Sequence, residues 1–209
     1  MKDSAASLRS FARRGYRWLA ARTRGPVIPS GETWDRQYQA GRWSYLAQLS
    51  ELSRYSVLTG YMAHLKPDAA VLDVGCGEGV LFERLLPHGY RRYVGVDVSA
   101  VAIARLADRH DEKTTFIAAD GEYYEPDERF DLIVFNEVLY FFRDPLAAVA
   151  RYCGALRPDG LLLVSTCTGF KRGLPILAAL KRSYAVVDET RVTHDDNEWS
   201  WICTVLALS

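Results

Sequence analysis

The pattern of apolar and polar positions divides the chain into a helical first part and a second part in which strands and helices alternate. Between residues 32 and 66, apolar residues such as Leu49, Leu52 and Met62 recur near helical spacing. This spacing predicts one or two helices that end before Pro67. From Ala69 onward, short apolar runs indicate buried strands. The predicted strands are 69–74, 93–98, 114–119, 132–135, 161–167, 185–192 and 199–208.

Helical segments separate these strands. A helix over 80–86 is stopped by Pro87, and Ser99 is a plausible N-cap for a helix through His110. Pro145 stands in the first turn of a third helix, which extends to Leu156. Residues 157–160 (RPDG) predict a turn, and a further helix covers 174–181. This alternation predicts an α/β fold, a doubly wound and largely parallel sheet with helices on both faces.

A glycine-rich turn directly after the first strand is the strongest chemical signal. Gly75, Gly77 and Gly79 leave the backbone bare where it bends sharply and approaches a ligand closely. Their GxGxG spacing does not match the GxGxxG spacing of dinucleotide-binding proteins. Asp73 precedes the turn, which suits a ligand bearing a positive amino group better than a pyrophosphate.

Two further acids follow the next two strands. Asp97 comes 22 residues after Gly75, near the place where a carboxylate meets ribose hydroxyls, and Asp120 is able to accept a hydrogen bond from an adenine amino group. Each acid alone is equally well explained as a loop cap. Three acids that each follow a predicted strand point to one site at the carboxyl edge of the sheet.

Five segments together resemble class I S-adenosylmethionine-dependent methyltransferases: VLDVGCGEG, GVDVS, FIAADGE, DLIVFNEVLYF and LRPDGLLLVS. The resemblance implies a Rossmann-like sheet of seven strands in the order 3-2-1-4-5-7-6 with the last strand antiparallel. It implies S-adenosyl-L-methionine as cofactor and S-adenosyl-L-homocysteine as product. It assigns Asp73 and the glycines to the methionine part, Asp97 to the ribose and Asp120 to the adenine. The cofactor contacts predicted in all are Tyr38, Trp43, Asp73, Gly75, Cys76, Gly77, Gly79, Asp97, Val98, Asp120, Gly121, Glu122 and Asn136.

The methyl acceptor is expected beside the fourth strand. Glu137 is a candidate to accept a proton or hold an ammonium group, although cofactor contact or a helix-terminal charge explains it equally well. Tyr140 follows one turn later, and His194 with Asp195 is a second candidate base, for which a polar hairpin turn is the simpler explanation. Related ubiquinone O-methyltransferases carry EVLEH where this chain has EVLYF, so no metal site is expected. The EVLYF segment and the small size of the chain also resemble those of enzymes such as the NodS group, which N-methylate an amino sugar.

The predicted organisation has three parts. Residues 1–31 form a basic arm and linker, residues 32–68 a helical lid, and residues 69–209 the cofactor-binding domain. The aromatic segment 34–46 is expected to close over cofactor and substrate, and residues 169–182 to form a second wall. Residues 8–24 hold six arginines and no acid, with Phe11, Trp18 and Leu19 on one helical face. This pattern fits peripheral contact with an anionic membrane, a mobile arm, a helix packed on the domain, or an organelle transit peptide.

The composition of the chain argues against several classes of partner and location. A net charge of zero argues against nucleic acid as partner, and no segment is apolar over the length that spans a bilayer. The four cysteines lack metal-ligand spacing, which together with the absence of a secretory signal favours the cytoplasm. We expect methyl transfer to an oxygen or nitrogen of a small molecule or saccharide. The alternatives are a non-catalytic methyltransferase-like partner subunit and, less favoured, an NAD-dependent oxidoreductase.

Overall fold

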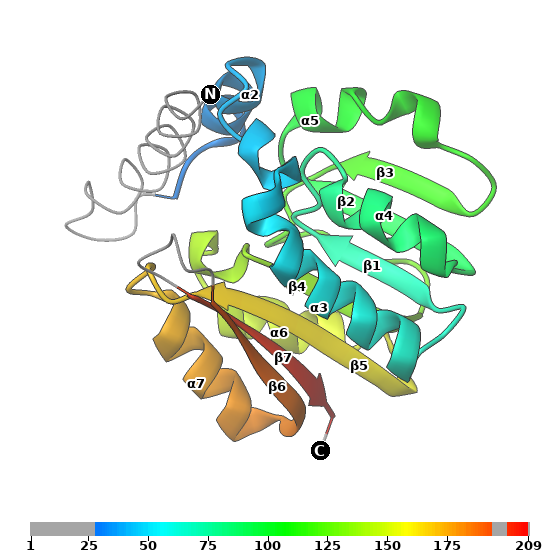
Figure 1. Cartoon of the computed structure of the whole chain (residues 1–209), viewed down its shortest axis with the longest axis vertical. Coiled ribbons are helices and arrows are strands. Elements are labelled where there is room, and N and C mark those ends of the chain that lie inside the picture. Colours follow the sequence, from blue (N-terminus) through cyan, green and yellow to red (C-terminus); the bar gives the residue numbers. More distant parts are fainter. Residues whose placement is uncertain (1–27, 194–199, 209) are drawn as a thin grey trace.

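A seven-stranded sheet forms the centre of the protein, with helices on both faces (Figure 1). The structure, a computed structural model, describes residues 28–193 and 200–208. The strand order is β3-β2-β1-β4-β5-β7-β6, and β7 runs antiparallel to both of its neighbours, so the predicted topology is confirmed. The strands are β1 Ala70–Val74, β2 Arg92–Asp97, β3 Thr114–Ala118, β4 Phe130–Asn136, β5 Leu156–Cys167, β6 Ala185–Thr193 and β7 Ser200–Ala207.

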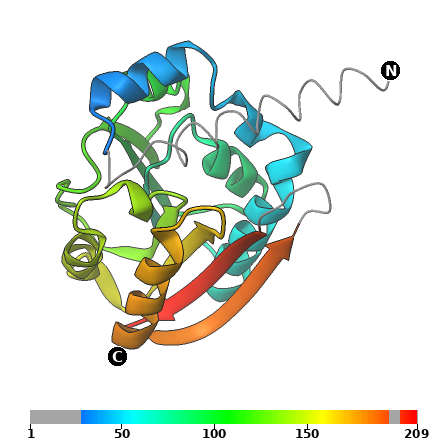
Figure 2. The ribbon, with the colours of Figure 1, turned by 90° about the vertical axis from the view of Figure 1, so that its left-hand side faces the viewer.

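The helices form two layers, which Figure 2 shows from the side. Helices α3, α4 and α5 pack on one face of the sheet, and α6 and α7 pack on the other. Their bounds are α2 Gly31–Gln39, α3 Leu49–Leu65, α4 Val80–Leu85, α5 Ala100–Ala104, α6 Pro145–Cys153 and α7 Gly173–Ser183, with short 3-10 turns η1 Ser44–Ala47, η2 Leu86–His88, η3 Ala107–Arg109 and η4 Leu139–Phe141.

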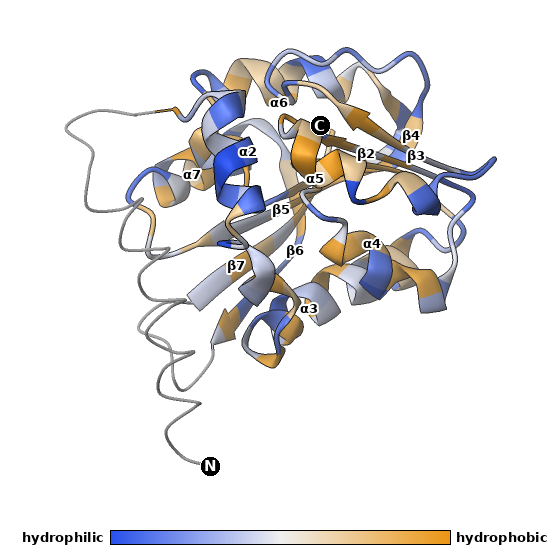
Figure 3. Ribbon diagram, turned by 90° about the horizontal axis from the view of Figure 1, so that it is seen from above, coloured by the Kyte–Doolittle hydropathy of each residue, from blue (hydrophilic) through white to orange (hydrophobic). Residues whose placement is uncertain are grey.

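Strand β1 lies at the centre of the hydrophobic core because all five of its residues are buried. Its side chains point alternately to the two faces: Val71 joins the cluster under α3 and α4, and Leu72 joins the cluster under α6 and α7. Figure 3 shows apolar residues along the central strands, whereas α2 is mostly hydrophilic. A strand covered on both faces has a continuous apolar sequence, and the apolar run at 69–74 correctly predicted such a strand.

Two local predictions differ from the structure. Helix α5 ends at Ala104 because the next amides, of Arg105 and Leu106, bond three residues back rather than four, which tightens the chain into 3-10 geometry. Residues 157–160, predicted as a turn, lie within β5. The pairing of β4 with β5 jumps from Phe130–Leu156 to Leu132–Leu161, so the extra residues bulge out of the ladder without ending the strand.

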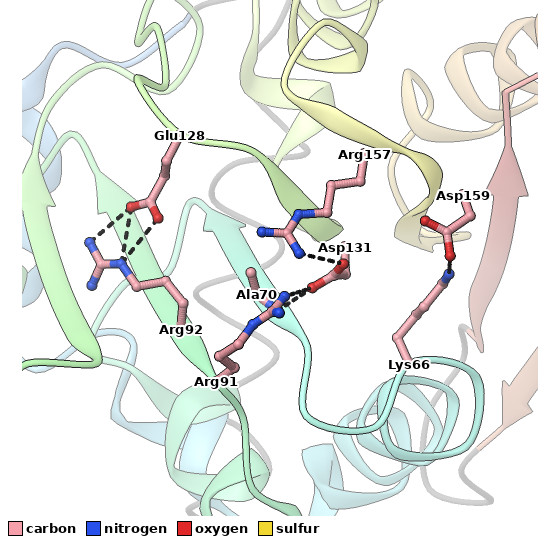
Figure 4. Close-up of polar contacts among 8 residues, drawn as sticks. All are labelled: Lys66, Ala70, Arg91, Arg92, Glu128, Asp131, Arg157 and Asp159. Atoms are coloured by element: carbon pink, nitrogen blue, oxygen red, sulfur yellow. Dashed lines mark hydrogen bonds and ion pairs between the residues drawn. The ribbon is translucent and has the colours of Figure 1, made fainter.

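The amino ends of the strands are joined by ion pairs, shown in Figure 4. Asp131 accepts hydrogen bonds from the amide of Ala70 at 2.6 Å and from Arg91 at 2.6 Å, and Arg157 lies 3.4 Å from its second oxygen. This carboxylate therefore ties the start of β4 to the start of β1 and to the segments entering β2 and β5. The network lies at the edge opposite the glycine turn, so its role is structural.

Helix α2 lies against α5, above the carboxyl ends of the strands (Figure 1). The basic segment 8–24 and the candidate base His194 lie outside the described residues. None of the helices in the described part of the chain is long and apolar enough to cross a membrane.

Candidate functional site

The glycine turn places bare backbone at the carboxyl end of β1. Gly75, Gly77 and Gly79 all have positive φ, at 81°, 55° and 76°. A Cβ atom at Gly75 would lie 2.6 Å from a methyl group of Val138, and one at Gly77 would lie 2.7 Å from the hydroxyl of Tyr38. Both the left-handed backbone and the close neighbours require glycine here.

Asp97 lies beside this turn at the end of β2. Each of its carboxylate oxygens accepts one backbone hydrogen bond, from the amide of Gly77 at 2.9 Å and from that of Ser99 at 2.8 Å. The bonds fix the carboxylate and leave each oxygen able to accept another hydrogen bond. Burial raises the pKa of Asp97 to about 6, although the two amides act in the opposite direction. Such a fixed pair of acceptors suits the two hydroxyls of a ribose.

Asp73 lies behind the turn and does not line the cavity. It is buried, and one oxygen accepts a hydrogen bond from the hydroxyl of Tyr93 at 2.6 Å. Its other oxygen has no hydrogen-bond partner among the described residues. Burial raises the pKa of Asp73 to about 7. Two buried carboxyls under one turn, Asp73 and Asp97, favour a ligand with positive charge over a pyrophosphate.

The segment after β3 supplies a third acidic group. Asp120 is exposed and accepts a hydrogen bond from the amide of Glu122 at 2.9 Å. The carboxylate of Glu122 is itself engaged by the amides of Arg143 and Asp144, at 2.9 and 2.7 Å. Of the two acids, Asp120 is therefore the better placed to bind a ligand group, and Glu122 holds the loop that precedes α6.

Glu137 follows β4 with a strained backbone, because its φ of 60° is left-handed. Its carboxylate accepts hydrogen bonds from the hydroxyls of Ser165 and Tyr140, both at 2.9 Å, and from the amide of Cys167 at 3.1 Å. Burial raises the pKa of Glu137, against the opposing effect of nearby Arg54. The hydroxyl of Tyr140, a residue that lines the cavity, thus donates to Glu137, and its oxygen is still able to accept a hydrogen bond.

Helix α3 contributes a buried arginine that sequence reasoning missed. Arg54 is completely buried, forms an ion pair with Glu51 at 3.0 Å and donates a hydrogen bond to the side-chain oxygen of Asn136. The hydroxyl of Ser165 lies 2.8 Å from the same oxygen, so its single proton is shared between Asn136 and Glu137. The only signal in the sequence was an acid and an arginine three residues apart in an apolar helix, which usually indicates a surface ion pair.

Aromatic rings in mutual contact line the part of the cavity next to η4. Trp34 of α2 contacts Phe141 of η4 edge to face, with ring centres 4.9 Å apart, and Tyr140 stacks on Phe170 at 4.2 Å. The predicted second wall is only partly correct: Phe170 lines the cavity, whereas Arg172 holds η4 by donating to the carbonyl oxygens of Tyr140 and Phe142. Trp34 belongs to the aromatic segment 34–46 that the sequence indicated, whereas no sequence signal marked Phe141 as a cavity residue.

One cavity of about 490 Å³ is lined by most of these groups. Asp73 and Gly79, both predicted to contact the cofactor, do not line it; Gly79 instead begins α4 and packs against Leu106. No cluster of metal-binding side chains occurs within residues 28–193 and 200–208. The predicted residues that do line the cavity are Tyr38, Trp43, Gly75, Cys76, Gly77, Asp97, Val98, Asp120, Gly121, Glu122, Asn136, Glu137 and Tyr140.

The chain is similar to known methyltransferases. A family model described as a methyltransferase domain matches residues 38–202. Nodulation protein S of Sinorhizobium fredii is 34% identical over 123 residues, covering 56% of each chain. A ubiquinone biosynthesis O-methyltransferase of Bradyrhizobium is 34% identical over 137 residues, covering 64% of this chain and 52% of the relative. The chain thus spans about half the length of the curated relatives it matches.

Solved structures agree on the fold. The N-methyltransferase NodS of Bradyrhizobium japonicum, in complex with S-adenosyl-L-homocysteine, superposes with a TM-score of 0.67 at 23% identity, covering 79% of this chain and 90% of that one. The 1,6-didemethyltoxoflavin-N1-methyltransferase of Burkholderia thailandensis, with bound 1,6-didemethyltoxoflavin and S-adenosylhomocysteine, gives a TM-score of 0.68 at 25% identity, covering 84% of this chain and 85% of that one.

Proposed function

The chain belongs to the methyltransferase domain family, and on that premise we propose that it transfers a methyl group from S-adenosylmethionine to an oxygen or nitrogen atom of a small molecule. The observation that carries this proposal is that Asp97 and the glycine turn line the same cavity as Glu137 and Tyr140. A cofactor site and a proton-accepting group that share one cavity are what methyl transfer to an O–H or N–H group requires.

The residues at the cofactor end fit the proposed cofactor. When bound, S-adenosylmethionine supplies a methyl group on a positively charged sulfur. Asp97 would bind the ribose hydroxyls and Asp120 the adenine, while the glycine turn admits the amino acid part. The buried carboxyls of Asp73 and Asp97 stabilise positive charge near the turn. This electrostatic environment speaks against the alternative of an NAD-dependent oxidoreductase.

Tyr140 and Glu137 are proposed to remove the acceptor's proton. During methyl transfer, the O–H or N–H proton of the acceptor would pass to the oxygen of Tyr140. The proton of Tyr140 moves along its existing 2.9 Å hydrogen bond to Glu137. Burial, which raises the pKa of Glu137, makes this carboxylate a better proton acceptor. The match to the methyltransferase domain model supports an enzyme over a non-catalytic subunit.

The acceptor is proposed to be small and partly apolar, because rings such as Trp34, Phe141 and Phe170 line its end of the cavity. The relatives leave the reacting atom open: one bears the name O-methyltransferase and a structural neighbour the name N-methyltransferase. Amines, phenols and amino sugars are therefore the compounds to screen.

The proposal is tested by screening those compounds with S-adenosylmethionine and measuring the S-adenosylhomocysteine formed. With a compound that is methylated, Glu137→Gln and Tyr140→Phe should lower the transfer rate by about 10²–10⁴-fold, as expected when a proton acceptor is lost. Both variants should still bind S-adenosylhomocysteine.

Tyr61→Phe is the matched control, because the hydroxyl of Tyr61 likewise donates to an acid, Asp188 at 2.8 Å, but lies outside the cavity. If Tyr140→Phe transferred methyl groups as fast as the control variant, the proposed proton relay would be wrong. A protein that binds the cofactor yet methylates none of the three compound classes would count against this range of acceptors.

A further inference from the structure

Helix α2 is anchored to the cofactor end of the site by the carboxylate of Asp35. One oxygen of Asp35 accepts two hydrogen bonds, from the hydroxyl of Ser99 at 2.6 Å and from the amide of Val101 at 3.1 Å. These partners lie 64 and 66 residues further along the chain. A carboxylate oxygen that accepts two hydrogen bonds from a separate element fixes the position of its own helix at that point.

The anchor leads directly to the proposed ribose-binding carboxylate. Ser99 is fully buried, its amide donates to Asp97 at 2.8 Å, and its hydroxyl accepts from the amide of Ala102 at 3.1 Å. Asp35, Ser99 and Asp97 therefore form one continuous chain of hydrogen bonds. The negative charge of Asp35 also contributes to the raised pKa of Asp97. Two carboxylates this close repel each other, so the geometry of the anchor must compensate for that repulsion.

The same helix covers the glycine turn. Tyr38 lies one turn after Asp35, and its hydroxyl takes up the space in which a side chain at Gly77 would lie. Arg105 of the segment after α5 donates to the carbonyl oxygen of Tyr38 at 3.1 Å and pairs with Glu78 of the glycine turn. These contacts hold α2 against the cofactor half of the cavity.

The contact of α2 with the opposite wall is of a different kind. There Trp34 touches Phe141 through an edge-to-face ring contact, with centres 4.9 Å apart. This contact is one between ring surfaces, which tolerates small shifts, whereas the two hydrogen bonds to Asp35 require one oxygen atom at a defined position. If α2 moves, it should part from Phe141 before it parts from Ser99.

We propose that Asp35 is a positioning residue for the cofactor: it holds α2 over the glycine turn, so that the cofactor stays bound while the acceptor exchanges on the Trp34–Phe141 side. The inference rests on the proposed function, since it takes the covered site to be that of S-adenosylmethionine. Asp35 acts through Ser99 and Tyr38 rather than by touching the reacting atoms.

The test measures association and dissociation rates of S-adenosylhomocysteine with the full chain. Asp35→Ala should raise the dissociation rate about tenfold or more. Asp35→Glu keeps the charge but displaces the oxygen, and it should also speed dissociation. Asp35→Asn keeps an oxygen in place without the charge, and it should remain within about twofold of the wild-type rate. Glu32→Ala, which removes an exposed acid from the same helix, is the matched control.

The contrast between Asp35→Glu and Asp35→Asn separates geometry from charge even where Asp35→Ala does not fold. Equal dissociation rates in all variants would overturn the proposal, as would a fast Asp35→Asn beside a slow Asp35→Glu. A wild-type protein that does not bind S-adenosylhomocysteine would instead contradict the proposed function.

Discussion

At the scale of single residues, the site combines strain with buried charge. Glu137 has a left-handed backbone, which costs about 1–3 kcal/mol and persists where the surroundings enforce it. Ser165, Tyr140 and Cys167 provide that enforcement through their three hydrogen bonds to its carboxylate. Asp97 is a buried carboxyl whose two oxygens are already oriented by backbone amides. Both residues are held in place before any ligand arrives.

The first prediction concerns Asp97. Asp97→Ala should weaken binding of S-adenosylhomocysteine by about 1.5–3 kcal/mol, the loss expected for charged hydrogen bonds. In the wild-type protein affinity should fall as the pH falls below about 6, because the carboxyl is then protonated. Asp97→Asn should remove this part of the pH dependence. Calorimetry across the pH range provides the measurement, and an affinity unchanged by Asp97→Ala would exclude Asp97 from the site.

Protonation of Asp97 affects the stability of the fold in the opposite direction to its effect on ligand affinity. Since burial raises the pKa of Asp97 in the folded state, the folded protein binds a proton more tightly than the unfolded chain does. The stability gained from this proton is fully present below the carboxyl's ordinary pKa. It is lost as the pH rises through about 6.

At the scale of elements, the carboxyl ends and the amino ends of the sheet's strands have different roles. The carboxyl ends carry the acids and glycines of the site, and the amino ends carry the ion pairs of Asp131 and its neighbours (Figure 4). Asp131 bonds to the first residue of β1 and to the arginines that precede β2 and follow the start of β5. The strands are thereby aligned at one edge while the other edge remains available for ligands.

The second prediction tests the structural role of the ion pairs at the amino edge of the sheet. Asp131→Ala should lower the free energy of unfolding by about 1–3 kcal/mol, because it leaves the amide of Ala70 without its carboxylate partner. Asp159→Ala is the control: its side chain is 79% exposed and pairs with Lys66 in solvent, so its loss should cost much less stability than the loss of Asp131. Chemical denaturation measures both. Equal losses in the two variants would contradict the structural role of Asp131.

At the scale of the whole molecule, ligand binding and folding are linked because the cavity is built from many elements. The lining comes from α2, α3, the glycine turn, the segments after β2, β3 and β4, and the loop before α7. A ligand that contacts all of these binds the folded chain and not the unfolded one. It therefore stabilises the folded state by mass action.

The third prediction follows. S-adenosylhomocysteine at 100 times its dissociation constant should stabilise the protein by about 2.7 kcal/mol, which a thermal shift can detect. NAD at the same concentration should cause no shift, because the buried carboxyls near the turn disfavour a pyrophosphate. Stabilisation by NAD alone would contradict the assignment of the site.

Part of the fold and the site could be derived from the sequence because it depends on local patterns. The apolar run of β1 and the glycines after it are determined within a few residues, and so is the cap at Ser99, whose hydroxyl accepts from Ala102 as expected. Asp97 and Asp120 follow from the rule that ligands bind at the carboxyl edge of such sheets. Periodicity, backbone conformation and this rule need no knowledge of distant contacts.

The remaining features were decided by tertiary structure. Arg54 meets Asn136 across 82 residues of chain, and Asp35 meets Ser99 across 64. Glu122 lines the cavity as the predicted cofactor contact requires, but its carboxylate accepts hydrogen bonds from the loop before α6, which the sequence did not indicate. Asp73 faces Tyr93 rather than the cavity. The sequence alone determined which strands end in polar groups, because that depends on neighbouring residues. Which of those groups point into the cavity depends on how helices and loops pack over the sheet, and that information lies in contacts between distant segments.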